Sequence, residues 1–477
     1  MPENILQPNV SGDKKSSWRE LFQQGRGPYT VLLNLGIGLH AIDIFIITTV
    51  MPTVVEDIGG LRYYTWTSML YMVGTIVGAA AGSHLRDQFG ARLGYFWGGM
   101  LLLIGTIGCA ISPDMLSLLI ARILKGVGGG LVISQSMSLV SDLYSPKIRT
   151  RILAFISTTW SVAALFGPGV GGLFAEINWW RGAFWSQAPF IILFLWMALK
   201  FVPNSEKNIH RLRFPWRRLS LLAGGVVAVG ISSQFKQPII NITLVATALT
   251  VVWLTFKIDS KSKAKLFPLG ALSLFTPVGL AYWSYFLISA THTTLLIFTP
   301  LFLQILHQIT PLYVGYLSLV FSIGWTIGSV AASGWSGWKE RWAGVGGMLM
   351  ATIATIGFSV AVLSGTMLMA TIWISFIGLG IGVTNVLMTN FGMSVPLKGE
   401  EAVTSGSMPT IRSLGVAFGA AAAGLVANSV GLSEGTSHEI VTKVATWTLG
   451  LTALIPVLTA CVCLRAVTWG WHFRTRI

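Results

Sequence analysis

The sequence contains few charged residues, and acids are the scarcer kind. Asp, Glu, Lys and Arg make up only 10% of the 477 residues, against about a quarter in soluble globular proteins. The chain has 17 acidic and 32 basic residues, which gives a net charge of +15. Hydrophobic residues account for 53%, and the mean hydropathy is +0.70. This composition excludes an ordinary soluble domain and predicts an all-α, polytopic membrane protein.

Cysteine is also scarce. The three residues Cys109, Cys461 and Cys463 each lie in an apolar segment, so the sequence provides neither a disulfide framework nor metal-ligand spacing. We therefore expect no metal site. The first 28 residues are polar and lack an apolar stretch followed by a cleavage site of small residues. We predict no cleaved signal peptide.

Long apolar stretches, by contrast, recur along the whole chain. A membrane-spanning helix needs about 20 mostly apolar residues, and we predict fourteen such spans. They cover residues 29–51, 64–84, 93–112, 114–137, 152–175, 182–202, 219–235, 238–257, 278–303, 312–334, 343–364, 366–389, 403–427 and 441–464.

The distribution of Lys and Arg indicates the orientation of these spans. With the N-terminus in the cytoplasm, 25 of the 32 basic residues lie on the cytoplasmic side, as the positive-inside rule requires. Loss of one span would invert the chain downstream and destroy this asymmetry. We therefore predict a multi-pass protein of a bacterial cytoplasmic (inner) membrane, with both termini cytoplasmic. The positive charge then reflects topology near anionic lipids rather than nucleic-acid binding. The remaining basic residues are Arg62, Arg181, Lys236 and Lys443 outside, and Arg122, Lys125 and Arg412 within spans.

The spans divide into six, two and six. We predict a cytoplasmic tail at 1–28, a six-helix bundle at 29–203 and a second six-helix bundle at 266–465, followed by a tail at 466–477. Between the bundles, residues 204–265 form basic cytoplasmic loops with two additional transmembrane helices. Two six-span halves are typical of transporters whose halves rock about a central site.

A cytoplasmic motif follows the second span. The stretch SHLRDQFGAR, residues 83–92, resembles the pattern G-x-L-x-D-x-x-G-x-R of the major facilitator superfamily. Leu85, Asp87, Gly90 and Arg92 match this pattern, and Ser83 replaces the usual glycine. The resemblance implies a gate at the cytoplasmic side, and a tight turn there needs Gly90. The alternative is a solvated turn.

Two further motifs lie in spans four and five. RILKGVGGG, residues 122–130, resembles R-x-x-Q-G-x-G, with Lys125 in place of Gln. GPGVGG, residues 167–172, matches the pattern G-P-x-x-G-G of the antiporters of this superfamily through Gly167, Pro168, Gly171 and Gly172. Helix kinking and close packing are the alternative explanation for such a cluster.

The first span carries the most specific resemblance. LHAIDIFIITTVMP, residues 39–52, is similar to the L-D-x-T-x-V-N-x-A-L-P pattern of the fourteen-span drug:proton antiporter family. Asp43 and Pro52 match, whereas Phe45 and Thr48 depart from the usual Thr and Asn. LFLQ at 301–304 and IRSLGVAFG at 411–419 also resemble this family. The resemblance implies a major facilitator fold and proton-coupled antiport.

The residues themselves link Asp43 to Arg122. Asp43 precedes Pro52 by nine residues and Arg122 follows Pro113 by nine, so both lie about 13 Å below the outer surface at 1.5 Å per residue. We predict an ion pair that keeps Asp43 ionised until a conformational change or a substrate lets a proton bind. A purely structural ion pair is the alternative. His40, one turn away, is either a proton relay or an ordinary polar residue.

The predicted cavity carries surplus positive charge. Asp43 is the single acid predicted deep in a span, against Arg122, Lys125 and Arg412. This balance favours anionic, zwitterionic or neutral substrates over dications. Interhelical hydrogen bonding or packing is the alternative role for each candidate cavity residue. These candidates are Thr48, Lys125, Gln135, Trp160, His292, Gln304, Asn385, Asn390 and Arg412.

These observations predict a proton-coupled antiporter that exports small organic compounds such as drugs. The alternatives are an exporter of an endogenous anionic or zwitterionic metabolite such as a siderophore, or a uniporter or importer of the same fold. The sequence lacks the paired carboxylates or nucleophile constellation of an enzyme, and GVGGG lacks the G-K-[ST] of a phosphate loop. We therefore expect no enzymatic activity and no cofactor, with a proton gradient as the energy source. The expected partners are substrate, protons and the lipid bilayer, without nucleic acid, and the protein is expected to act as a monomer.

Overall fold

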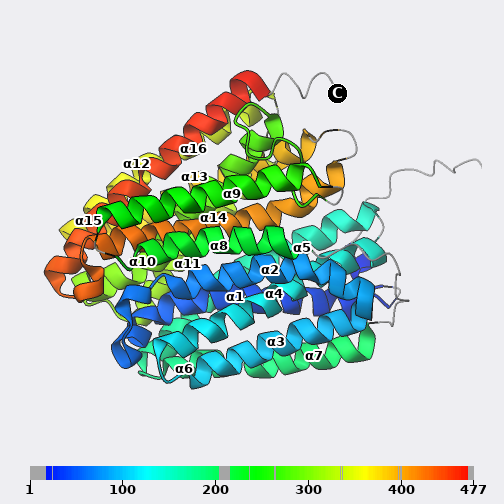
Figure 1. The fold of residues 1–477 in the computed structure, drawn as a ribbon, viewed down its shortest axis with the longest axis horizontal. Coiled ribbons are helices and arrows are strands. Elements are labelled where there is room, and N and C mark those ends of the chain that lie inside the picture. The colour runs from blue at the N-terminus through cyan, green and yellow to red at the C-terminus, as the bar shows by residue number, and fades with distance from the viewer. Residues whose placement is uncertain are drawn as a thin grey trace, which may run out of the picture.

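Long helices run side by side through the whole molecule (Figure 1). The computed structural model describes residues 18–470 except 24, 145, 203–214, 236, 263–264, 334, 336, 396 and 398–399. Within this part of the chain every regular element is a helix. The predicted boundary at 203/204 and most of both predicted tails lie outside the described residues, so the domain boundaries stay predictions.

The N-terminal half contains six crossings of the bundle. The sixth crossing is broken at residues 186–187, just before Pro189, which cannot donate a backbone hydrogen bond. The helices are α1 (Gly27–Ile58), α2 (Trp66–Phe89), α3 (Ala91–Ile111), α4 (Met115–Leu143), α5 (Pro146–Glu176), α6 (Trp180–Trp185) and α7 (Ala188–Phe201).

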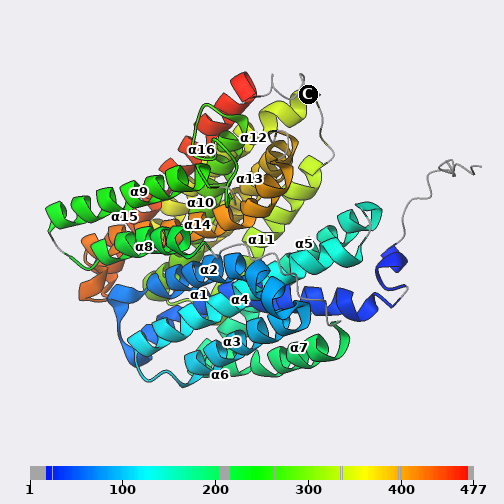
Figure 2. The ribbon, with the colours of Figure 1, turned by 45° about the vertical axis from the view of Figure 1, so that its right-hand side comes forward.

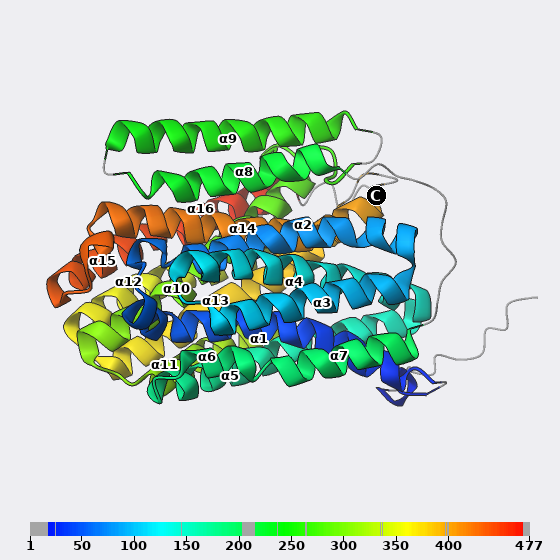
Figure 3. The same cartoon turned by 60° about the horizontal axis from the view of Figure 1, so that its bottom comes forward.

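The C-terminal half repeats this arrangement, and its last crossing is also broken near a proline, Pro456. Its helices are α10 (Pro277–His307), α11 (Pro311–Ser333), α12 (Gly337–Ser364), α13 (Met367–Ser394), α14 (Glu401–Ser429), α15 (His438–Thr452) and α16 (Leu454–Arg465). Two further helices, α8 (Trp216–Ser232) and α9 (Pro238–Ser260), lie against the outside of the bundle, with α9 outermost (Figure 3).

The predicted all-α membrane fold is confirmed. Within the described residues, eleven segments are long and apolar enough to cross a membrane, and α2, α5 and α8 run alongside them (Figure 1). Counting α6 with α7 and α15 with α16 gives the predicted fourteen crossings. Most of the helices are longer than the apolar stretches that predicted them. The first, for example, continues through Pro52 to Ile58.

Glycines bring the same helix pairs into backbone contact in both halves. Gly74 and Gly78 of α2 lie against α4, and a Cβ atom at either position would collide with a carbonyl oxygen of α4. Gly126 and Gly130 of α4 lie equally close to α2. Gly324, Gly328, Gly378 and Gly382 make the equivalent contacts between α11 and α13. This internal repeat is typical of transporters built from two related bundles.

The two halves meet at the end of the molecule where α1 ends. The Tyr64 hydroxyl donates a hydrogen bond to the Ile297 carbonyl at 3.3 Å, and its ring stacks on Phe298. α5 meets α11 where Gly172 packs on Leu312, and Gly315 on Pro168. Toward the opposite end, α5 diverges from the C-terminal half (Figure 2).

Candidate functional site

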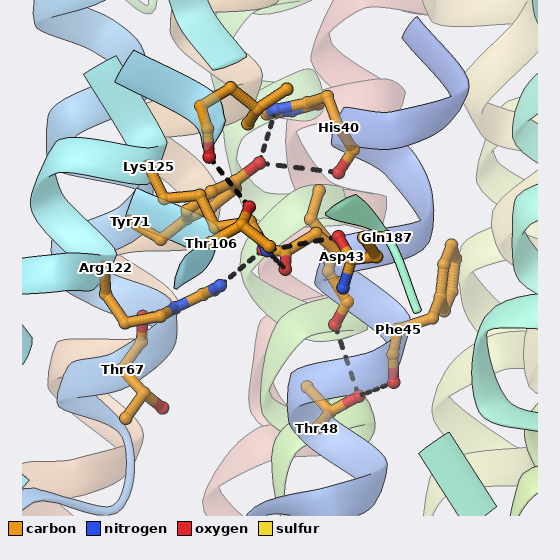
Figure 4. A network of polar contacts seen from close by, with 12 residues as sticks. His40, Asp43, Phe45, Thr48, Thr67, Tyr71, Thr106, Arg122, Lys125 and Gln187 are labelled. Carbon is orange, nitrogen blue, oxygen red and sulfur yellow. Dashed lines mark hydrogen bonds and ion pairs between the residues drawn. The ribbon is translucent and has the colours of Figure 1, made fainter. Parts of the chain in front are cut away.

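A buried carboxylate bridges two cations at the centre of the N-terminal half (Figure 4). Asp43 of α1 accepts a hydrogen bond from Nη1 of Arg122 and another from Nζ of Lys125, the latter at 2.5 Å. All three side chains are fully buried. The ion pair expected between Asp43 and Arg122 is therefore present. The contact between Asp43 and Lys125 was not predicted, although the i, i+3 spacing of the two cations on α4 was a usable signal.

Neighbouring helices complete the surroundings of the two cations. Lys125 also donates to the Gln187 side-chain oxygen at 3.1 Å, and Gln187 lies at the break between α6 and α7. The Nε atom of Arg122 donates to the Thr67 carbonyl at 3.0 Å. Its Nη2 atom, in contrast, is buried and has no hydrogen-bond partner among the residues that the structure describes. Sequence reasoning missed Gln187, although Pro189, two residues further on, was a usable signal for a break in the helix.

Tyr71 of α2 connects this cluster to His40. Its ring lies 4.2 Å beneath the Arg122 guanidinium carbon, and its hydroxyl is hydrogen-bonded to Nδ1 of His40 at 2.7 Å. Gly129 of α4 leaves the space for this pair, since a Cβ atom there would lie 2.8 Å from Nδ1 of His40. Sequence reasoning missed Tyr71, because an aromatic residue in an apolar span is usually part of the packing.

A cavity of about 170 Å³ lies between the two halves next to this cluster. Arg412 of α14 reaches across it, with its guanidinium carbon 4.2 Å from the centre of the Trp160 ring of α5. Among the described residues that line the cavity, none carries a carboxylate. The polar and aromatic lining residues are His40, Phe45, Thr48, Ser68, Tyr71, Arg122, Trp160, Tyr285, His292, Thr293, Arg412 and Ser413.

Five expected lining residues lie elsewhere. Lys125 is enclosed with Asp43, and Gln135 donates to the Gly82 carbonyl at 2.7 Å, so it joins α4 to α2. Gln304 and Asn385 do not line the central cavity, and Asn390 is exposed near the end of α13. These expectations were wrong because apolar composition places a residue in a span but does not fix the rotation of the helix.

A larger cavity of about 400 Å³ lies between α9 and the C-terminal half, away from Asp43. The described residues that line it are apolar or uncharged. Because His40, Arg122, His292 and Arg412 line the central cavity and no charged residue among those described lines the larger one, we place the candidate site in the central cavity.

The cytoplasmic motif forms the predicted turn between α2 and α3. Gly90 has φ = +84°, a conformation that favours glycine. Arg92 donates from Nε to the Val202 carbonyl at 2.6 Å, which joins the start of α3 to the end of α7. Leu85 is half-buried, and the side chains of Ser83 and Asp87 lie outside the described part of the chain.

The GPGVGG stretch lies where α1, α5 and α11 meet. A Cβ atom at Gly167 would lie 2.7 Å from that of Phe45, and one at Gly171 would lie 3.1 Å from the Ile46 carbonyl oxygen. Gly172 and Pro168 pack on α11 instead. These residues therefore join the helix that carries Asp43 to the opposite half.

Comparisons with known proteins place this geometry in a family. Residues 33–420 match the sequence profile of the Major Facilitator Superfamily. The chain belongs to this superfamily. The resemblance stated from the motifs is thus confirmed, and the protein is a transporter rather than an enzyme.

Two similar proteins are named as multidrug transporters. A probable multidrug-efflux transporter of Mycobacterium tuberculosis is 27% identical over 88% of this chain and 91% of its own length. The multidrug transporter protein MdtP of Bacillus subtilis is 24% identical over 88% of this chain and 77% of its own. Among solved structures, a D-xylose–proton symporter covers 92% of this chain and 97% of its own at 15% identity, with a TM-score of 0.64. That likeness shows the fold alone.

Proposed function

We propose that this transporter exports small organic compounds such as drugs in exchange for protons. The observation that carries the proposal is Asp43, a carboxylate buried in mid-helix and held by two cations beside the central cavity. A buried ion pair is a weak source of stability, because desolvation opposes the attraction. A role in coupling accounts better for its position.

Coupling follows from a difference in proton affinity between two conformations. While Arg122 and Lys125 contact Asp43, the ionised carboxylate is favoured. When α1 and α4 move apart, the carboxylate loses these partners and a proton replaces them. We assign the present arrangement to the state that has released its proton. In this state the halves touch at the extracellular end and the cavity serves the cytoplasmic side.

The cavity supplies the substrate contacts in this proposal. Trp160 and His292 offer rings for stacking, and Thr48 offers a hydroxyl. The present volume of about 170 Å³ is smaller than the roughly 300–1,000 Å³ of pockets for drug-sized ligands. A drug therefore enters only when the halves separate further. The protein works as a monomer in the cytoplasmic membrane, with both termini in the cytoplasm, and takes its energy from the proton gradient without a cofactor.

A second candidate is proton-linked transport of an organic anion. Two observations favour it: Nη2 of Arg122 is buried without a partner, and Arg412 lines the same cavity. An anion bound to Arg122 competes with Asp43 for its cation and so favours protonation of Asp43. By reciprocity, the proton favours the anion. Anion and proton would then travel together rather than in exchange, so the direction of proton movement separates the two candidates.

Substrate-driven proton flux in proteoliposomes tests both candidates. The panel contains a monocationic dye, a dicationic dye, a neutral drug and an organic acid, each added to the intact protein and to Asp43→Asn. Exchange predicts opposed movements of protons and substrate that Asp43→Asn abolishes, whereas co-transport predicts movement in the same direction. Asp57→Asn is the matched control, since Asp57 also belongs to α1 but pairs with Arg181 near the surface. Proton-independent flux that Asp43→Asn leaves unchanged would refute proton coupling.

A further inference from the structure

The cavity of about 400 Å³ lies under α9, remote from the transport site. It is bounded by one stripe of α9, namely Val245, Leu249, Val252 and Phe256, which recur at helical spacing. The opposite walls come from α10, α14 and the paired helices α15 and α16. The wall is almost entirely apolar, so water gains nothing by filling the cavity.

The length of this cavity matches one leaflet of a bilayer. From Val245 to Phe256 the stripe runs about 16 Å along the helix at 1.5 Å per residue. Half the hydrocarbon core of a bilayer is about 15 Å. The occupant suggested by these dimensions is a single extended hydrocarbon chain aligned with the helices.

The cavity leads to a polar pocket at one end. A second space of about 200 Å³ shares Phe256, Ala271 and Leu272 with the first. It is lined by Lys257, Ser260 and Ser273, and the Lys257 ammonium lies 4.7 Å from the centre of the Trp253 ring. A lysine and a tryptophan at the end of an apolar helix are typical of the membrane–water interface.

Asp259, the acid that lines this pocket, does not repel a bound anion. Asp259 is buried and accepts hydrogen bonds from Arg218 and from the backbone N–H groups of Leu266 and Phe267. Its charge is therefore compensated. Lys257, in contrast, is exposed and makes no ion pair within the described residues. The polar pocket thus presents the positive charge of Lys257 to a ligand.

We propose that this crevice binds one anionic glycerophospholipid, with an acyl chain in the apolar cavity and its phosphate at Lys257. The site explains the two additional helices. α8 contacts both halves, through Gly230 against Met69 of α2 and through Ser233 near Asn428 of α14. A lipid under α9 holds the α8–α9 pair in place where it bridges the halves.

Native mass spectrometry of the full-length protein, titrated with phosphatidylglycerol or with phosphatidylcholine of the same acyl chains, tests this site. We expect one phosphatidylglycerol to be retained at collision energies that remove the others, with phosphatidylcholine at least fivefold weaker. Lys257→Gln should weaken phosphatidylglycerol about tenfold and remove the preference between the two lipids. Ala422→Phe, which places a ring in the cavity, should abolish retention of both lipids.

Two control variants outside the crevice test whether the loss of lipid is specific to this site. Lys261→Gln removes a charge four residues further along the chain, just past the end of α9, and Leu254→Phe enlarges an exposed side chain of α9. Neither residue lines the crevice. Both should retain the lipid as the intact protein does. Lys257 is exposed, so Lys257→Gln should fold normally even if Ala422→Phe does not. Equal retention in Lys257→Gln and Lys261→Gln, or no preference for phosphatidylglycerol in the intact protein, would overturn the proposal.

Discussion

Nζ of Lys125 lies 2.5 Å from Oδ1 of Asp43, and neither side chain reaches solvent. The superfamily pattern that this stretch resembles carries Gln at this position. In this chain one carboxylate therefore balances two buried cations, Lys125 and Arg122, rather than one. The second cation further favours the ionised carboxylate.

Lys125→Gln should leave Arg122 as the single cation that contacts Asp43, and it should shift the pH dependence of transport. The amide can still donate to Asp43, but the carboxylate loses one of two positive charges and binds a proton more readily. We expect the pH of half-maximal proton-coupled flux to rise by about one unit. Lys443→Gln, which breaks an exposed pair with Glu439, is the control and should leave that pH unchanged. An identical profile for both variants would show that Lys125 has no influence on the proton site.

Asp43→Ala should destabilise the protein more than Asp43→Asn does. Removing the carboxylate leaves two buried cations without a counter-charge, and such losses typically cost about 3–5 kcal/mol. The Asn amide oxygen can still accept from one of the two cations. Thermal unfolding in detergent measures the difference, and a double variant Asp43→Ala/Lys125→Met should recover part of the loss. No recovery would mean that uncompensated charge is not the cause.

Tyr71→Phe should separate the two roles of Tyr71. The ring remains beneath Arg122, while the hydroxyl contact with His40 is lost, at a cost of about 0.5–1.5 kcal/mol. We expect proton-coupled flux to persist. Gly129→Ala should be more harmful, because its methyl group would press on both His40 and the Tyr71 hydroxyl. If Tyr71→Phe abolishes coupling instead, the hydroxyl itself belongs to the proton pathway.

Gly126→Ala and Gly382→Ala should lower stability by similar amounts. Each added methyl group would collide with a backbone carbonyl of the partner helix, α2 or α11, and overpacking typically costs about 1–3 kcal/mol. Gly346→Ala in α12 is the control, since a Cβ atom there meets no atom within 4 Å. Denaturation of the three variants measures how much each one lowers the free energy of unfolding. A loss confined to one half would contradict the structural repeat.

Lowering the pH should destabilise the loop before α10, because Glu400 becomes protonated. Burial would raise the pKa of Glu400, but hydrogen bonds from Lys265 at 2.6 Å and the Leu269 N–H at 2.9 Å hold the pKa below its ordinary value of 4.5. The contact therefore stabilises the fold above pH 4.5 and is lost as pH falls through the lower folded value. The protection factor of the Leu269 amide, which corrects for the intrinsic pH dependence of exchange, should fall there, whereas in Glu400→Gln it should be low at every pH. A protection factor that does not change with pH in the intact protein would contradict this.

The sequence was sufficient for features that depend on position along a helix. Apolar length predicted the crossings, and equal distance from Pro52 and Pro113 predicted that Asp43 and Arg122 meet. It was not sufficient for features that depend on helix rotation. Gln135 turns toward Gly82 instead of the cavity, and Gln187 reaches Lys125 only because the sixth crossing breaks beside it. Such contacts are fixed by packing between segments distant in the chain.

The glycine contacts between α2 and α4 have a mechanical consequence. Where backbone touches backbone, no side chain can change rotamer to absorb a displacement, so α2 and α4 move as one rigid body. The same holds for α11 and α13. Relative motion then occurs outside these pairs, between α1 and α4 at Asp43 and at the seams between the halves, where α5 meets α11 and Tyr64 meets α10. Distances between spin labels should stay constant within each glycine-packed pair and change across these seams when substrate is added.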